Sequence, residues 1–217
     1  MMRLILLGLV LAAAISPVPS AQAHPHILVN AEAEMHFDGQ GRLVAVRNIW
    51  HFDPVFSAYA TQGYDADGDG IYTREELQPL AEINMKSLSD FDFFTWVAVE
   101  GTVRKLDPPE DYWLDYEGNV LTLRFTLPLA EPIPADEGPM VVDIYDPDYY
   151  VAYQMAQGEP AVLIESPEPC SAEVRRPEPL DSETAMELAE IPADVRELPP
   201  ELAEVTADLV NRVTIRC

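Results

Sequence analysis

The feature that most constrains the fold of this chain is an alternation of residue types between His26 and Phe37. Every second residue from Ile27 to Phe37 is apolar, and the positions between them are mostly polar. Because successive side chains of a β-strand point to opposite faces, this period predicts a strand with one buried face. Residues 38–41 (DGQG) form a turn signal. The apolar face then continues at Val44, Val46, Trp50 and Phe52, which predicts a β-hairpin.

Short apolar segments separated by proline and glycine turns predict further strands after the hairpin. They lie at Phe94–Glu100, Tyr112–Tyr116, Val120–Leu127, Met140–Tyr145, Tyr150–Tyr153, Ala161–Ile164 and Val213–Arg216. Many short strands with frequent turn signals are typical of a β-sandwich. We therefore expect a mainly β protein, namely an antiparallel, immunoglobulin-like β-sandwich, with one EF-hand-like helix–loop–helix inserted at about residues 53–89.

The first 23 residues have the features of a cleavable secretory signal peptide. Arg3 is their one charge, an apolar run extends from Leu4 to Ile15, and residues 21–23 (AQA) form a small-x-small cleavage signal. An apolar run of this length is too short to cross a bilayer but suits the core of a signal peptide. We predict that residues 1–23 are removed. Residues 24–217 then form a single β-rich periplasmic domain without a membrane span.

The charge balance and the two cysteines indicate the kind of compartment and partner. The 38 acidic residues outnumber the 13 basic ones, which argues against nucleic acid as a partner because phosphate binding needs clustered Lys and Arg. Cys170 and Cys217 are the only cysteines, and in an exported chain we expect a disulfide between them. A two-thiol metal site is the alternative. Residues from about 166 to 204 are rich in Pro and Glu and predict a loosely ordered connection with short helical pieces.

The segment Asp65–Glu76 (DADGDGIYTREE) has the spacing of an EF-hand calcium loop. Carboxylates fall at loop positions 1, 3, 5 and 12, and a glycine at position 6 permits the sharp turn. The expected calcium ligands are Asp65, Asp67, Asp69, the Ile71 carbonyl, Thr73 or its water, and Glu76. The alternative is an acidic turn that binds nothing. A lone exported loop of this kind is expected to bind Ca²⁺ with a Kd of about 10⁻⁴ to 10⁻³ M.

The segments on either side of this loop predict two helices. Asp53 followed by Pro54 is typical of a helix start, and Thr73 with Glu76 forms a capping box for a second helix. Pro79 lies inside that second helix, where we expect a kink.

Three of the four histidines are predicted to meet at the open end of the hairpin. A two-residue turn sets His26 opposite His51, whereas a four-residue turn sets His26 opposite Asp53. His36 lies about 33 Å from His26 along the strand and is not part of the group. The candidate ligands of a Zn²⁺, Ni²⁺, Co²⁺ or Cu²⁺ ion are His24, His26, His51 and Asp53. The alternative is a set of exposed histidines at a strand end.

A series of short motifs resembles a known family. The chain contains HPHILV after the predicted cleavage point, WHFDPVFSAY at residues 50–59, FFTW, LTLRFTLPL, YDPDYYVAY at residues 145–153 and a terminal IRC. This series is similar to the exported proteins of domain of unknown function 1007, described as the periplasmic component of an uncharacterised ABC-type transport system. The resemblance implies an association with nickel/cobalt-type membrane transporters.

The leading expectation is a non-enzymatic periplasmic protein that captures or delivers a transition metal for a membrane transporter and holds structural calcium in its loop. The alternative is a calcium-stabilised exported interaction module without a transition-metal role. An enzyme is the third and weakest interpretation, because the chain has no nucleophile motif. A redox-active copper site at an N-terminal histidine would be the one basis for enzymatic activity. The role of Tyr145–Tyr153 is also open. The segment is either a strand that packs in the core after an Asp-Pro turn, or it forms a partner surface or adds metal ligands from Asp146 or Asp148.

Overall fold

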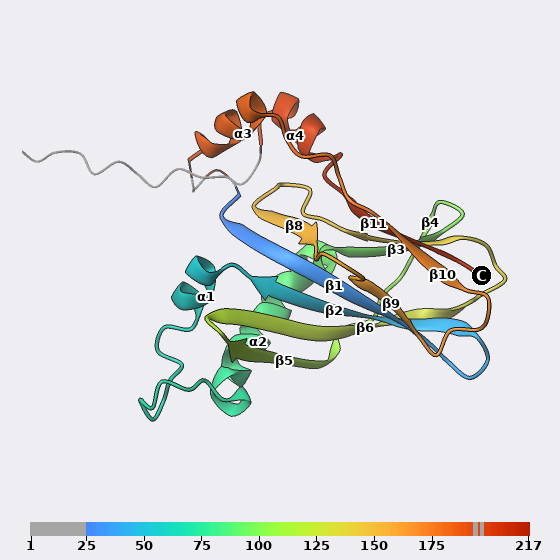
Figure 1. The fold of residues 1–217 in the computed structure, drawn as a ribbon, viewed down its shortest axis with the longest axis horizontal. Coiled ribbons are helices and arrows are strands. Elements are labelled where there is room, and N and C mark those ends of the chain that lie inside the picture. Colours follow the sequence, from blue (N-terminus) through green and yellow to red (C-terminus); the bar gives the residue numbers. More distant parts are fainter. Residues whose placement is uncertain (1–24, 193–194, 196–197) are drawn as a thin grey trace, which may run out of the picture.

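The computed structural model describes residues 25–192, 195 and 198–217. The predicted signal peptide and His24 lie outside the described residues. Figure 1 shows the elements, which are β1 (Ile27–Phe37), β2 (Arg42–Phe52), α1 (Pro54–Ala60), α2 (Arg74–Leu88), the 3₁₀ helix η1 (Ser89–Phe94), β3 (Thr95–Val99), β4 (Thr102–Arg104), β5 (Glu110–Glu117), β6 (Val120–Pro134), β7 (Met140–Ile144), β8 (Val151–Met155), β9 (Ala161–Ile164), β10 (Ser171–Arg175), α3 (Ser182–Ala189), α4 (Pro200–Thr206) and β11 (Asn211–Arg216).

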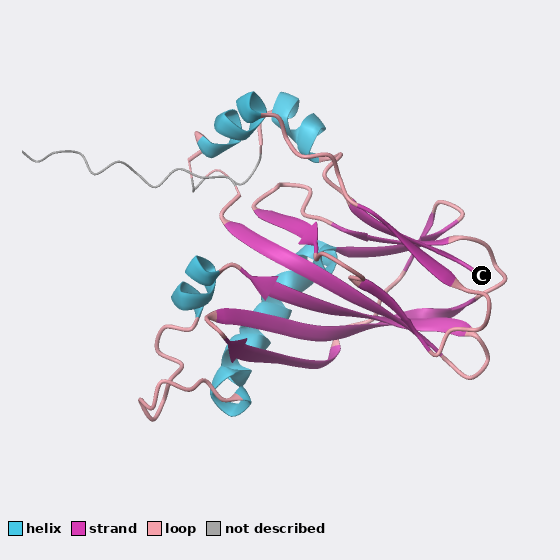
Figure 2. Ribbon diagram, viewed as in Figure 1, coloured by secondary structure: helices cyan, strands magenta, loops and turns pink. Residues whose placement is uncertain are grey.

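The strands form two sheets, so the protein is mainly β, as the sequence predicts (Figure 2). The six-stranded sheet has the order β5-β6-β2-β1-β8. β8 pairs with the first half of β1, and β9 pairs with its second half. The five-stranded sheet has the order β10-β11-β7-β3-β4 and is antiparallel throughout. In the six-stranded sheet β1 runs parallel to β8 and β9. The expectation of purely antiparallel sheets is therefore wrong, and the first sheet is mixed.

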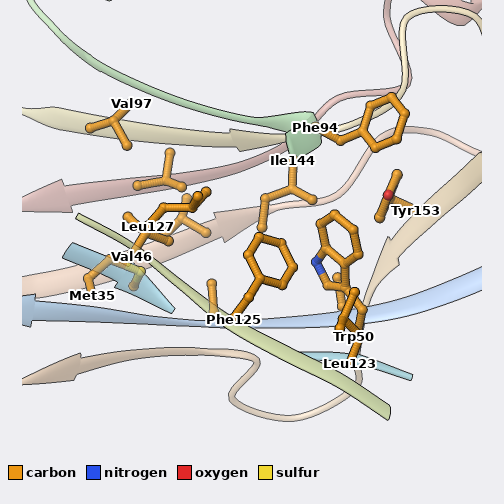
Figure 3. Packing of buried hydrophobic residues seen from close by; sticks show 14 of the residues in the cluster. Met35, Val46, Trp50, Phe94, Val97, Leu123, Phe125, Leu127, Ile144 and Tyr153 are labelled. Atoms are coloured by element: carbon orange, nitrogen blue, oxygen red, sulfur yellow. The ribbon is translucent and has the colours of Figure 1, made fainter. Parts of the chain in front are cut away.

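Residues from both sheets pack into one hydrophobic core, which gives the fold its sandwich-like character. Trp50 of β2 meets Phe125 of β6 edge-on with ring centroids 4.8 Å apart, and Tyr153 of β8 lies 4.9 Å from the same indole (Figure 3). Ile144 and Val97 reach this cluster from the five-stranded sheet. Large aromatic side chains bury about 150–250 Å² each, so this cluster holds the two sheets together.

Helix α2 extends the same core toward the β5 edge of the six-stranded sheet. Its buried residues Leu77, Ala81 and Met85 are spaced four apart and therefore lie on one helix face. The helix packs against β5 and runs behind the strands in the view of Figure 2. The helix continues through Pro79, and the kink predicted there stays a prediction. This packing fixes the start of α2, where the predicted calcium loop ends.

The hairpin β1–β2 forms in a different register from the predicted ones. Val46, Trp50 and Phe52 are buried as predicted, but at the bulge Leu43 is buried instead of Val44. Phe37 pairs with Leu43, a bulge follows between Leu43 and Ala45, and His51 then pairs with Asn30. Both registers predicted from short turns are wrong. The larger turn at residues 38–42 and the bulge together shift the pairing by two residues beyond the four-residue-turn register. A shift by two residues keeps every side chain on its own face, so the apolar pattern alone could not exclude it.

The C-terminal part of the chain contains more regular structure than its composition predicts. β10 lies inside the Pro/Glu-rich segment and pairs with β11, and the short helices α3 and α4 follow β10. Cys170 and Cys217 form the predicted disulfide at the end of the β10–β11 ladder, where Ser171 faces Arg216. In the part of the chain that the structure describes, no helix is long and apolar enough to cross a membrane.

Candidate calcium centre

The predicted calcium loop lies between α1 and α2, at the opposite end of the molecule from the C-terminus (Figure 1). Gly68 and Gly70 have φ values of 76° and 80°, in the left-handed region that glycine adopts at little cost. These two residues let the loop fold back on itself. The Asp65 carboxylate then accepts hydrogen bonds from both glycine amides, at 2.8 Å from Gly68 and 3.0 Å from Gly70.

Three of the predicted ligands converge in this loop. Carboxylate oxygens of Asp65, Asp67 and Glu76 all lie within 4.8 Å of one another. Among the described residues, these three form the one group of His, Cys, Asp and Glu side chains with metal-ligand proximity. Three carboxylates this close repel one another when ionised, and a cation between them would remove that repulsion.

The remaining predicted ligands border this group without belonging to it. The Asp69 carboxylate accepts a hydrogen bond from the Ile71 amide at 2.7 Å, and the Thr73 hydroxyl donates to Glu76 at 2.9 Å. The Ile71 side chain is exposed, as expected for a position that offers only its carbonyl. Asp69, Ile71 and Thr73 thus lie in the same loop, but only the carboxylates of Asp65, Asp67 and Glu76 converge.

Glu76 connects the two ends of the loop. One of its oxygens accepts a hydrogen bond from the Ala66 amide at 2.8 Å, and the other accepts one from the Thr73 amide at 2.9 Å. These bonds, with the Thr73 amide as the largest contribution, hold the pKa of the Glu76 carboxyl below its usual value of 4.5. The same contacts form the predicted capping box at the start of α2, which is confirmed.

The loop is docked on β5 by two side chains that the sequence did not identify. The ring of Tyr72 lies 4.7 Å from that of Tyr116, and Arg74 donates to the Asp115 carboxylate at 2.7 Å. The Arg74 guanidinium also lies 5.0 Å from the Trp113 ring centroid, a cation–π contact. No sequence signal pairs these positions, because they meet only when α2 packs on β5.

The entering helix differs from the predicted EF-hand-like geometry. Asp53 caps α1 as expected, and its carboxylate accepts hydrogen bonds from Val55 and Phe56 at 2.9 Å. However, α1 has seven residues and ends at Ala60, well before Asp65. The order helix, acidic loop, helix is present, but an EF-hand in its full form is not confirmed.

Among the described residues, the predicted transition-metal ligands His26, His51 and Asp53 do not form a common group. His51 lies opposite Asn30, so His26 is displaced along β1 by about 13 Å at strand rise. The His51 ring nitrogens lie 2.9 Å from Thr122 Oγ1 and 3.4 Å from Glu32 Oε1. The His26 ring instead packs on Tyr150, with centroids 4.5 Å apart.

Asp53 and His24 complete the predicted transition-metal set. Asp53 serves as the cap of α1 and also accepts a hydrogen bond from the Leu28 amide at 3.2 Å. His24 lies outside the described residues. The transition-metal site stays a prediction, and the described geometry does not assemble it. His36 was predicted to lie outside this set of ligands. In the structure its ring contacts the Glu34 carboxylate at 3.1 Å.

The segment Tyr145–Tyr153 contributes to the core and to a turn whose first residue, Asp146, is buried. Tyr153 packs on Trp50, while Asp146 is 5% exposed and accepts hydrogen bonds from the amides of Asp148 and Val151, each at 2.9 Å. Burial raises the pKa of the Asp146 carboxyl above its usual value of 3.8. The reading of a strand that enters the core after an Asp-Pro turn is confirmed.

Fold and site together define a mainly β protein with an acidic loop held between two helices and fixed on a sheet edge. The chain belongs to the family described as "Protein of unknown function (DUF1007)", whose model matches residues 9–217. It is also 24% identical over 136 residues to an "Uncharacterized protein" of Haemophilus influenzae. That match covers 62% of this chain and 64% of the relative. The transport association that the family resemblance implies stays a prediction.

Proposed function

We propose that this protein is an exported calcium-binding module in which one Ca²⁺ at Asp65–Glu76 fixes the junction between α2 and β5. The observation that carries the proposal is the convergence of the Asp65, Asp67 and Glu76 carboxylates within 4.8 Å. Calcium prefers several oxygen ligands, and carboxylates supply them together with charge. In the proposed bound state Asp69, the Ile71 carbonyl and Thr73 complete the EF-hand-like ligand set.

The docking of the loop supports a structural role for the ion. Tyr72 and Arg74 lie inside the twelve-residue loop pattern and contact β5 through Tyr116 and Asp115. An ion that orders the loop therefore also orders the side chains that hold the β5 edge. A Kd of about 10⁻⁴ to 10⁻³ M, typical of extracellular modules, suits such a clip.

Export to the periplasm is part of the proposal. It is supported by the signal-peptide features of residues 1–23 and by the Cys170–Cys217 disulfide, since disulfides persist in oxidising compartments. Delivery of a transition metal to a membrane transporter, implied by the resemblance, gains no support from the placement of His26 and His51. We therefore favour the calcium module over the transport role.

The decisive experiment measures thermal unfolding of residues 24–217 with and without calcium. If Ca²⁺ binds the folded state with the expected Kd, about 10 mM of the ion raises Tm by about 3 to 10 °C. Glu76→Gln keeps the shape of the side chain but removes its charge, so it abolishes most of the rise.

The matched control is Glu75→Gln, the same change at the neighbouring, exposed position outside the converging group. It should leave the calcium-dependent rise in place. A Tm that calcium does not move, or an equal loss in Glu75→Gln and Glu76→Gln, contradicts the proposal.

A further inference from the structure

A cavity of about 410 Å³ lies where three distant segments meet, away from the calcium loop. The start of β1, the end of α2 with η1, and the connection between β7 and β8 each contribute to its wall. Most of the wall is apolar or aromatic and is formed by Ile27, Leu88, Phe91, Phe94, Tyr150 and Val151. Phe94 also belongs to the hydrophobic core, where its ring lies 5.6 Å from that of Tyr153 (Figure 3). The cavity therefore opens directly beside one end of the core.

Two carboxylates, and no Lys or Arg, line this mostly apolar cavity. Asp146 is buried, and its carboxylate accepts hydrogen bonds from the backbone amides of Asp148, Tyr150 and Val151. A carboxylate has about four lone-pair sites, so this carboxylate can accept a further hydrogen bond. Asp148 is exposed at the same wall and adds a second negative charge close to Asp146. Negative charge beside apolar surface favours a ligand that carries a positive charge.

Three aromatic rings line the same cavity as these carboxylates. Phe91 and Phe94 stack with ring centroids 5.4 Å apart, and Phe91 and Tyr150 are 42% and 39% exposed. Two of the three rings are therefore accessible from solvent. The faces of aromatic rings attract cations, which is how proteins recognise alkylammonium groups.

The backbone on two sides of the cavity is held in a rarely populated conformation. Asp92, Phe93 and Phe94 are three consecutive residues with φ values of 49°, 53° and 47°, and Tyr149 has a φ of 51°. Such values are uncommon for residues other than glycine and persist only where the surrounding structure fixes them. The surrounding structure therefore fixes the backbone of two segments that contribute to the cavity wall.

We propose that this cavity binds an organic cation with an apolar body, of the class of protonated arylalkylamines. The apolar body lies against Phe91, Phe94 and Leu88, and the ammonium group lies toward Asp146 and Asp148. The net charge of −25 adds a long-range attraction for cations over anions. A bare metal ion fits less well, because among the described residues these two carboxylates gain no third Asp, Glu, His or Cys ligand.

The test is a ¹H–¹⁵N NMR titration of residues 24–217 with 2-phenylethylamine, in buffer that contains calcium. We expect shifts confined to the amides of residues 87–94 and 146–151. A ligand of this size with ordinary efficiency per atom gives a Kd of about 1 mM or lower. The neutral analogue 2-phenylethanol should bind at least about tenfold more weakly, and phenylacetate should bind more weakly still.

Asp148→Asn is the informative variant, because Asp148 is exposed and its side chain is not needed for the turn hydrogen bonds that Asp146 accepts. It should weaken 2-phenylethylamine binding about five- to tenfold, and Phe91→Ala should weaken it similarly. The matched control is Asp136→Asn, which removes the same charge at an exposed position outside the cavity. It should leave the affinity within twofold.

Three outcomes overturn the proposal. The first is the absence of shifts at about 10 mM 2-phenylethylamine, well above the expected Kd. The second is equal affinity for 2-phenylethylamine and 2-phenylethanol, which would make the cavity an apolar site. The third is a change of the same amides with protein concentration alone, which would show that a second copy of the chain fills the cavity.

Discussion

The acidic loop and the aromatic cavity both present carboxylates, but they hold them in opposite environments. In the loop, Glu76 accepts hydrogen bonds from nearby backbone amides, and its pKa lies below the usual value. At the cavity, Asp146 is buried, and its pKa lies above the usual value because desolvation outweighs its hydrogen bonds from backbone amides. The loop is one continuous segment, whereas the cavity is assembled from three.

The two sites also differ in how far the sequence alone reveals them. A loop whose ligands follow a fixed spacing is visible in the sequence, because neighbouring residues and two glycines determine its shape. A cavity formed by β1, α2 and the β7–β8 connection has no spacing to detect. Its carboxylate and its rings come within reach of each other only after the sheets have packed.

The first prediction concerns whether calcium binding by the loop depends on its contacts with β5. Arg74→Gln removes the bond to Asp115 and the contact with Trp113, so the loop loses part of its support on β5. Exposed ion pairs contribute about 0.2–1 kcal/mol, so the calcium Kd should rise by up to about fivefold. Titration calorimetry measures it. Arg175→Gln, at an exposed position in β10, is the control and should leave the Kd unchanged.

A double-mutant cycle with Asp115→Asn sharpens this test. If Arg74 acts through Asp115, the two single changes and the double change should weaken calcium binding by similar amounts. Strictly additive effects would show that Arg74 supports the loop through Trp113 instead.

The second comparison is the pH dependence of the two carboxylates in calcium-free buffer. Because the pKa of Glu76 is lowered in the folded state, its contribution to stability is present above pH 4.5 and is lost as the pH falls through its folded pKa. Because the pKa of Asp146 is raised, its contribution is present below pH 3.8 and is lost as the pH rises through its folded pKa.

Side-chain carboxyl ¹³C titration by NMR measures both midpoints. The Glu76 midpoint should lie below 4.5 and the Asp146 midpoint above 3.8. Bound 2-phenylethylamine should lower the Asp146 midpoint, since a nearby cation favours the carboxylate. Midpoints at the ordinary values for both residues would remove the contrast between the two environments.

The smallest expected effect concerns the histidines. In the observed register His51 pairs with Asn30, so His26 lies about 13 Å farther along β1. We therefore expect His51→Ala and His36→Ala to change Zn²⁺ binding equally little. Calorimetry with Zn²⁺ and Ni²⁺ on residues 24–217 measures this. A large loss in both His26→Ala and His51→Ala, with none in His36→Ala, would instead show that the predicted transition-metal site forms.

Several elements of the fold were visible in the sequence because they depend on neighbouring residues. The buried face of β1, the Asp53 cap of α1 and the Thr73–Glu76 capping box all follow from local periodicity or spacing, and all are present. By contrast, β10 was missed, because its few residues include charged ones and it is a strand only through its pairing with β11. The docking contacts of Tyr72 and Arg74 were missed for the same reason, since their partners are distant in sequence.

Local patterns were enough to predict most of the buried face of the first hairpin, the acidic loop and the cysteine pair. Contacts between distant segments were needed to establish the hairpin register, the parallel pairing of β1 with β8 and β9, and the cavity that Asp146 shares with Phe91 and Phe94. The physical reason is that a period of two fixes faces but permits any shift by two residues. The choice among those shifts is made by a bulge and by contacts between segments distant in sequence.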